Sequence, residues 1–167
     1  MADRLKEGEP VEDRAVGERP VGGYAALIGV FAGLVGGFSA WLRATGRELP
    51  ERVPASDLAL LTVATHKASR LIARDRVTSA VRAPFTEVEA GAHARGGRKE
   101  RPAGRGARRA VGELMLCPYC LSVWIASVFA AGLVVAPRPT RWAAGILTTV
   151  FGSDVLQIAY KKAEDSL

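Results

Sequence analysis

Apolar positions along the chain gather into long runs that carry few charges, and polar segments separate these runs. The run over residues 21–42 holds no ionisable side chain apart from Tyr24. At about 1.5 Å per helical residue, a run of this length crosses a hydrocarbon layer of roughly 30 Å. It predicts a membrane-spanning helix, and its flank of mixed charge does not resemble the basic start of a cleaved signal peptide.

Two further apolar runs, at residues 117–136 and 142–160, predict a pair of membrane helices. Pro137 and Pro139 lie between them and predict a tight turn, so we expect an antiparallel helical hairpin. A weaker run at residues 55–73 ends in a stripe of basic side chains. This helix either crosses with those side chains reaching the interface or lies along the surface, and we expect it to cross.

Together these runs predict an all-α fold, an integral membrane helical bundle, and no segment shows the alternation typical of a strand. Four spans are expected, at about residues 21–42, 55–73, 117–136 and 142–160, within a membrane helical domain at residues 21–160. Before this domain, residues 1–20 mix acids and bases and predict a disordered tail, and residues 161–167 predict a short cytoplasmic tail.

Composition changes the picture mainly in the connection at residues 90–112, which is rich in Gly and Arg. It has neither helical nor strand periodicity, so we expect a disordered basic loop inserted into the helical domain. Its bases between Arg95 and Arg109 are Arg95, Arg98, Lys99, Arg101, Arg105, Arg108 and Arg109. Such a loop can bind anionic lipid headgroups. No aromatic residue interleaves these bases, so we expect no specific nucleic acid partner.

Small residues recur at every fourth position of the first run, at Ala25, Gly29, Gly33 and Gly37. This spacing lines one helix face with groups that let another backbone approach closely. The face predicts close helix packing, and four short helices of this kind would bury themselves better as a homodimer through Gly29, Gly33 and Gly37.

Asp154 lies past the middle of the last apolar run, where an acid is costly inside a membrane unless it has a partner. With the basic loop in the cytoplasm, the second and fourth spans run in the same direction. His66, Lys67 and Arg70 then lie at the depth of Asp154 and of Gln157, one turn further on. Asp154 is either part of a structural ion pair or a functional carboxylate that binds a proton or an ion.

Cys117 and Cys120 open the third run in the order Cys-Pro-Tyr-Cys. Pro118 suits the first position of a helix, which makes Cys117 the expected N-cap, where backbone N–H groups stabilise a thiolate. The same four letters occur in glutaredoxins, but the strands and the βαβ frame of that fold cannot be found here. The pair is open to three interpretations: packing of small residues, redox thiols, or half of a metal site.

Zinc is the metal that such a set would hold, with Cys117, Cys120 and His66 as candidate ligands and Asp154 as a fourth. His93 is the other histidine of the chain. Two chains could instead pool their cysteines around one ion. Nothing in the spacing of these residues requires either site, so we expect no cofactor. A reducing cytoplasm predicts two free thiols rather than a permanent disulfide.

The combined pattern over residues 55–160 resembles the bacterial membrane family known as domain of unknown function 1360 (DUF1360). The residues that carry the resemblance are Arg70, Asp75, Arg82, Pro84, Cys117, Cys120 and Trp124. The resemblance implies a bacterial cytoplasmic membrane location and a recurring polar set, but no activity, substrate or cofactor. In this topology both termini and the basic loop are cytoplasmic.

Three functions fit these features. An interaction or structural role in the membrane is favoured, with the Gly face and the basic loop making the contacts. The first alternative is a thiol–disulfide redox or metal-binding protein, with Cys117 as the attacking thiolate and Cys120 as the resolving thiol. The second is a small ion or solute carrier that uses Asp154. The sequence holds no phosphate-binding Gly loop, nucleophile elbow or zinc-protease helix, so a conventional enzyme is not expected.

Overall fold

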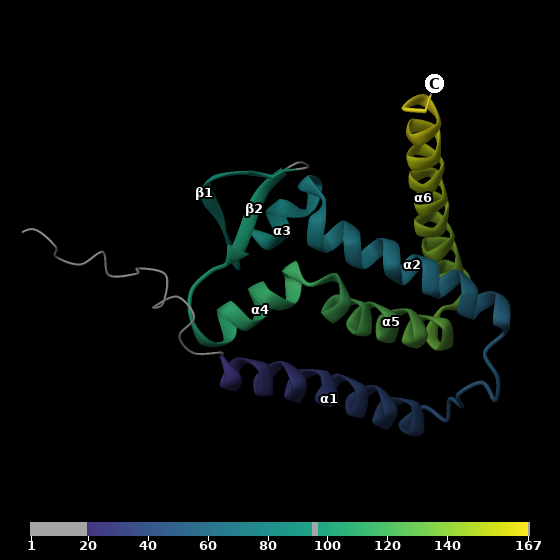
Figure 1. Cartoon of the computed structure of the whole chain (residues 1–167). Helices are drawn as coiled ribbons and strands as arrows, with labels where there is room; N and C mark the ends of the chain where they lie inside the picture. The colour runs from purple at the N-terminus through teal and green to yellow at the C-terminus, as the bar shows by residue number, and fades with distance from the viewer. Residues whose placement is uncertain (1–19, 95–96, 167) are drawn as a thin grey trace, which may run out of the picture.

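The computed structural model of the chain describes residues 20–94 and 97–166, and for residues 89–94 and 97–99 it describes the backbone alone. The tail expected at residues 1–20 lies, except for Pro20, outside the described residues. The helices are α1 (Val21–Ala44), α2 (Ala55–Arg74), the 3₁₀ turn η1 (Arg76–Thr78), α3 (Ser79–Arg82), α4 (Gly106–Leu116), α5 (Pro118–Val135) and α6 (Pro137–Glu164). The all-α class is confirmed, because helices make up nearly all of the regular structure (Figure 1).

Three of these helices, α1, α5 and α6, are long and apolar enough to cross a membrane. The helix expected from residues 55–73 forms as α2, but among the described residues it is not a fourth span by composition. The reason is local: Asp57 at its start and the basic side chains of its last turns interrupt the apolar positions. The expected short tail after residue 160 is also partly helical, since α6 continues to Glu164.

The expectation of a disordered loop at residues 90–112, and of no strand, is wrong. Strand β1 (Thr86–Ala94) pairs antiparallel with β2 (Gly97–Pro102), and α4 begins soon after. In the register, Thr86 lies opposite Pro102 and Val88 opposite Glu100. The hairpin is held from outside by an ion pair between Glu100 and the helix α3, a contact that local periodicity does not reveal.

Helices α1, α5 and α2 lie side by side, while α6 rises steeply from one end of this layer (Figure 1). The two prolines expected in a turn instead form the first turn of α6, since only Ala136 separates α5 from α6. As a result α6 does not fold back along α5 as the expected antiparallel hairpin would. Its most extensive contacts are with α2. The β-hairpin and α3 lie at the other end of the layer, beside α4 (Figure 1).

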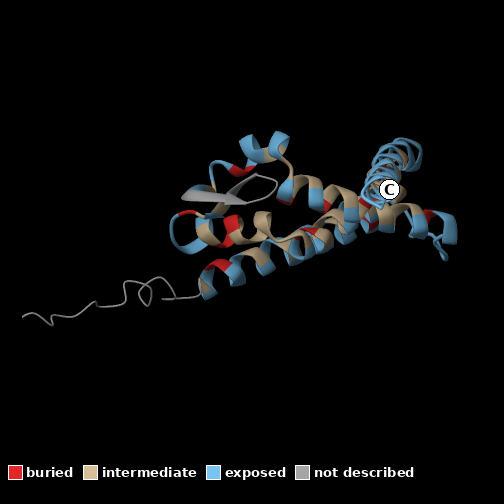
Figure 2. Ribbon diagram, turned by 45° about the horizontal axis from the view of Figure 1, so that its top comes forward, coloured by how far each residue is buried: buried red, intermediate tan, exposed pale blue. Residues whose placement is uncertain are grey.

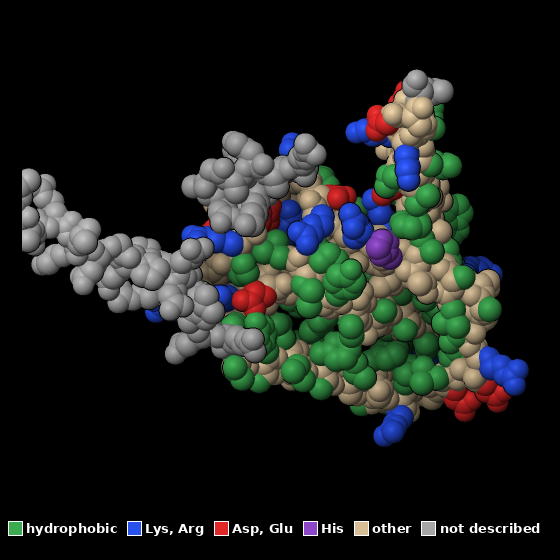
Figure 3. Space-filling model, in the orientation of Figure 1, with side chains coloured by type: hydrophobic (Ala, Val, Ile, Leu, Met, Phe, Trp, Pro, Cys, Tyr) green, Lys and Arg blue, Asp and Glu red, His purple; other side chains and the backbone are tan. Residues whose placement is uncertain are grey.

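Few residues of the described chain are buried, and those that are apolar are mostly alanines, such as Ala64, Ala110 and Ala144. Large apolar side chains instead point outward, and α6 is exposed along most of its length (Figure 2). Hydrophobic side chains cover the face over α1 and α5, whereas Lys and Arg gather near α2 and the hairpin (Figure 3). An apolar exterior of this kind is typical of helices that lipid covers.

Candidate functional site

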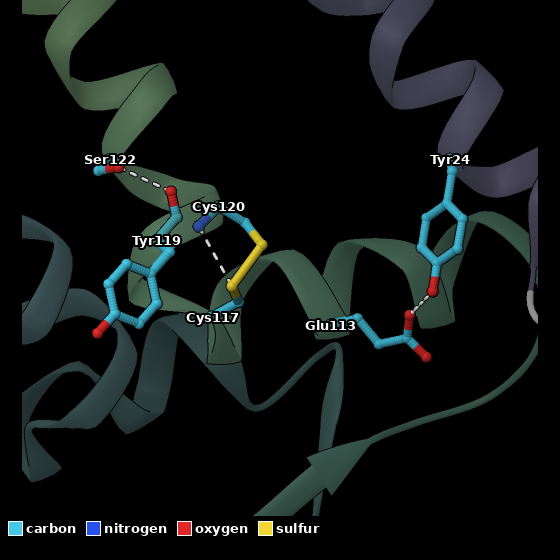
Figure 4. The surroundings of a disulfide bond; sticks show 6 residues. All are labelled: Tyr24, Glu113, Cys117, Tyr119, Cys120 and Ser122. Carbon is cyan, nitrogen blue, oxygen red and sulfur yellow. Dashed lines mark hydrogen bonds between the residues drawn. A yellow bond between two sulfur atoms is a disulfide. The ribbon is translucent and has the colours of Figure 1, made fainter.

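The break between α4 and α5 places both cysteines. Pro118 cannot continue a helix from α4, and it pushes the preceding residue into an extended conformation. Cys117 accordingly has φ −104° and ψ 101°, and it is the N-cap of α5, as the sequence predicts. Its Sγ accepts a hydrogen bond from the backbone N–H of Cys120 at 3.2 Å (Figure 4).

Cys117 and Cys120 are joined by a disulfide, with their Cα atoms 5.3 Å apart. The expectation of two free thiols is therefore wrong for this structure. The Cys-x-x-Cys spacing at a helix start brings the two sulfurs together across the first turn of α5. Cys120 is exposed, whereas Cys117 is half-buried.

A cavity of about 550 Å³ lies between α1, α4 and α5, and both cysteines line it. Most of its other lining is apolar and includes Leu27, Ile28, Phe31, Leu114, Val123 and Trp124. The rings of Phe31 and Trp124 meet edge to face with centroids 5.1 Å apart. Trp124 thus packs against α1 on the cysteine side of the cavity, one turn after Cys120.

Two polar side chains, Tyr24 and Glu113, also line this cavity. The Tyr24 hydroxyl donates a hydrogen bond to Oε2 of Glu113, and Nε of Arg109 donates to Oε1 at 3.0 Å. Figure 4 shows this pair and the disulfide in the space between α1 and the junction of α4 with α5, while Tyr119 points away from them. Sequence reasoning missed Glu113 because nothing in its local pattern shows that α1 will lie opposite.

The structure brings together part of the predicted polar cluster. Lys67 Nζ donates to Asp154 Oδ2 at 2.6 Å, and the ring of His66 meets that of Phe151 edge to face at 5.4 Å. Gln157 instead donates to Ser153 at 3.4 Å. The Arg70 side chain is exposed and makes no ion pair with the described residues.

A second ion pair joins α2 to α6 and was not predicted. Arg141 donates from Nε and Nη2 to the two carboxylate oxygens of Asp57 at 2.8 and 2.7 Å. Thr148 also donates to the carbonyl oxygen of Leu60 at 3.2 Å. Since Asp57 and Lys67 pair in order with Arg141 and Asp154, the two helices run in the same direction through their contact.

Arg82, one of the residues that carry the family resemblance, is only 3% exposed. Its Nε and Nη2 donate to the Glu100 carboxylate at 2.9 and 2.8 Å, and its Nη1 donates to the carbonyl oxygen of Ile72 at 2.6 Å and to Thr78 Oγ1 at 2.7 Å. One guanidinium thus joins the end of α2, the turn η1 and the hairpin. The hydrogen bonds from Arg82 hold the pKa of Glu100 below its usual value, against the opposing effect of burial.

Two neighbours of Arg82 in the same motif contribute backbone groups. The carbonyl oxygen of Asp75 accepts from Arg82 Nη1 at 3.1 Å, and that of Pro84 accepts from Arg108 Nε at 2.8 Å. Among the described side chains of the basic segment, Arg101 pairs with Glu87 across the hairpin at 3.3 Å. Arg95 lies outside the described residues, and the side chains of Arg98, Lys99 and His93 are not described. Binding of lipid headgroups by this segment stays a prediction.

The predicted homodimer face on α1 is not tested by the structure, whereas the predicted zinc ligands do not come together. An added Cβ at Gly29, Gly33 or Gly37 would meet nothing within 4 Å, so the described part of the chain does not cover that face, and the homodimer stays a prediction. His66 and the two cysteines do not form a metal site in the described part of the chain, where no three His, Cys, Asp or Glu side chains are grouped for one ion.

Comparison with known proteins finds one family. The model of DUF1360, described as a protein of unknown function, matches residues 60–160, which is more than half of the chain. This range agrees with the resemblance seen in the sequence. No curated protein and no solved structure matches.

Proposed function

The chain belongs to the DUF1360 family, and we propose that it acts in a membrane as a thiol–disulfide redox protein. The working pair is Cys117 and Cys120. The observation that carries this proposal is the place of their disulfide: it closes the first turn of an apolar helix and lines a cavity between three helices.

The helix start gives the two cysteines different roles. In the reduced protein, backbone N–H groups at the start of α5 favour a thiolate on Cys117, since the N–H of Cys120 already donates to its sulfur. This thiolate attacks a substrate disulfide, forms a mixed disulfide and releases one substrate thiol. Cys120 then attacks Cys117 Sγ, which closes the protein disulfide and releases the second substrate thiol. The reverse sequence oxidises a pair of substrate thiols.

The alternative is that this disulfide only stabilises the fold. The stabilisation that a disulfide gives increases with the length of the loop that it closes. Cys117 and Cys120 are separated by only 3 positions, so their bond constrains the unfolded chain very little. Its formation and loss can therefore occur within an intact fold, which favours an exchanging pair.

The interaction role favoured by the sequence remains the second candidate, supported by the open face at Gly29, Gly33 and Gly37. The carrier role has less support. Asp154 is already hydrogen-bonded to Lys67 at 2.6 Å, as expected for a structural ion pair between helices.

Redox titration of the purified chain in lipid nanodiscs tests the proposal. In mixtures of reduced and oxidised glutathione, the fraction of disulfide, read from maleimide mass shifts, should follow a reversible two-electron titration. The Cys120→Ser variant should trap glutathione on Cys117, and its alkylation should stay fast below about pH 8.5, where a free cysteine ionises. The matched variant Cys117→Ser should trap far less.

Two results would contradict the redox role. One is a disulfide that resists reduction while the chain stays folded by circular dichroism. The other is equal alkylation rates for the two single variants at every pH, because the helix start would then confer no reactivity on Cys117.

A further inference from the structure

The cavity between α1, α4 and α5 has a redox bond in its wall and an apolar lining elsewhere, apart from Tyr24 and Glu113. We propose that this cavity binds the ring of a membrane quinone, which accepts two electrons from the reduced Cys117 and Cys120. The inference rests on the proposed redox function, because it names the electron acceptor and thereby the oxidising direction of that chemistry.

The position of the cavity selects an apolar ligand that arrives through the bilayer. Two of its walls, α1 and α5, are helices apolar enough to cross a membrane. Ile28 and Val123 line it and are 70% and 56% exposed, on the surface that lipid would cover. A ligand that enters between them comes from hydrocarbon rather than from water. The volume of about 550 Å³ lies within the range of small-molecule sites, roughly 300 to 1,000 Å³.

The lining of the cavity suits a flat ring that carries oxygens. Phe31 and Trp124 offer aromatic surface next to the cysteines. Tyr24 and Glu113 supply a hydroxyl and a carboxylate within an otherwise apolar wall, and such a small number of polar groups fixes the orientation of a ligand. A saturated lipid chain has no polar group that could form a hydrogen bond with this pair.

Electrons and protons balance without a further reactant. Oxidation of the dithiol breaks two S–H bonds, forms one S–S bond and releases two electrons and two protons. The quinone takes both electrons, and its two carbonyl oxygens take two protons to give the hydroquinone. Glu113 is the only carboxylate among the described residues that line the cavity, and it carries the proton that leaves Cys117 to a quinone oxygen, while the proton of Cys120 goes to the other oxygen.

The test uses the full chain in nanodiscs, reduced with dithiothreitol and then freed of it. Decylubiquinone is added to one sample, and diamide, a polar thiol oxidant, is added to another. Disulfide formation is followed by maleimide mass shift and quinone loss by absorbance. We expect one quinone consumed per disulfide formed. Ile28→Trp, which fills the cavity, should slow the quinone reaction at least tenfold while diamide still oxidises the exposed Cys120 and its partner.

Leu34→Trp is the matched control, since it adds the same side chain to an exposed position of α1 outside the cavity and should leave both rates unchanged. Glu113→Gln is a second variant that fills no space, and it should slow the quinone reaction but not the oxidation by diamide. Equal quinone rates in the wild type, Ile28→Trp and Glu113→Gln would overturn the inference and leave the redox function standing. Failure of diamide to re-form the bond in the folded wild type would overturn the redox function itself.

Discussion

The segment at residues 75–105, here called the polar cap, and the three apolar helices α1, α5 and α6 hold their shape by different means. In the polar cap, which contains η1, α3 and the β-hairpin, nearly every donor of the buried Arg82 is used. The apolar helices bury few large side chains and meet their neighbours at small residues and single ion pairs. The exterior of these helices consists mostly of apolar side chains, whose exposure to water is unfavourable. In the polar cap, by contrast, the polar groups form hydrogen bonds with one another.

This difference teaches where a single substitution should matter most. A polar network concentrated on one residue fails when that residue is removed, because it leaves buried partners without hydrogen bonds. Helices that lipid surrounds depend on many small contacts, so the loss of one contact should cost less. Four experiments sharpen this comparison.

The largest effect should follow Arg82→Ala, because it leaves the Glu100 carboxylate, whose side chain is 14% exposed, with the Thr86 hydroxyl in place of a charged partner. We expect the free energy of opening the cap to fall by about 3 to 5 kcal/mol. Hydrogen exchange of the Ala103 amide, which donates to the carbonyl oxygen of Phe85, measures this opening. Arg101→Ala removes an exposed pair with Glu87 and should change the same quantity by less than about 1 kcal/mol. Similar losses in both variants would contradict a dominant role for Arg82.

Gly112→Ala should come next, because it breaks the contact between α4 and the cap. An added Cβ would collide with the carbonyl oxygen of Phe85 and approach Pro102 Cα to 3.2 Å. Overpacking of this kind costs about 1 to 3 kcal/mol, measured as a lower free energy of opening at the same Ala103 amide. Gly29→Ala adds the same methyl group to an open face of α1 and should have no destabilising effect. A loss at Gly29 would instead show that a second chain covers that face.

A smaller loss is expected when the ion pair between α2 and α6 is removed. Lys67→Met leaves Asp154 without its donor and should cost about 0.6 to 1.7 kcal/mol, from the average to the largest value found for interhelical hydrogen bonds in membranes. The apparent melting temperature in detergent micelles reports the loss. Lys161→Met, an exposed change in the last turns of α6, serves as the control. Exchanging the two charges, with Lys67→Asp and Asp154→Lys together, should restore part of the stability.

The smallest effect is a dependence of the cap on acid. The pKa of Glu100 is lowered in the folded chain, chiefly by hydrogen bonds from Arg82, so the unfolded chain binds a proton at higher pH than the folded chain does. The pair therefore stabilises the cap fully above the unfolded pKa of about 4.3, and this stability is lost as pH falls through the lower folded value. Hydrogen exchange between pH 5 and 3 should show the loss. Glu100→Gln should flatten this slope, whereas Glu87→Gln should leave it unchanged.

Residue patterns predict the helices of this protein well, because their length and polarity are properties of single segments. The N-cap at Cys117 follows in the same way from Pro118. The hairpin does not, since its strands owe their position to Glu100 meeting Arg82, and neither residue signals a strand by itself. The cavity beside the cysteines is equally hidden, because it forms only when α1 packs beside α4 and α5. The ion pair of Lys67 with Asp154 could be predicted because Asp154 lies inside an apolar run, where an acid needs a partner. Asp57 and Arg141 lie near the starts of their helices, where charged residues are common, so their pairing could not be predicted.

The two ion pairs between α2 and α6 have a consequence for the parity of membrane crossings. Three crossings, by α1, α5 and α6 alone, would leave the start of α1 and the end of α6 on opposite sides of a bilayer. Helix α2 runs in the same direction as α6 and is bound to it at two places, by Asp57 with Arg141 near the start of both helices and by Lys67 with Asp154 past the middle of both. Helix α2 therefore decides the parity: the two ends of the helical domain lie in the same compartment if α2 crosses with its partner, and in opposite compartments if α2 stays on the surface.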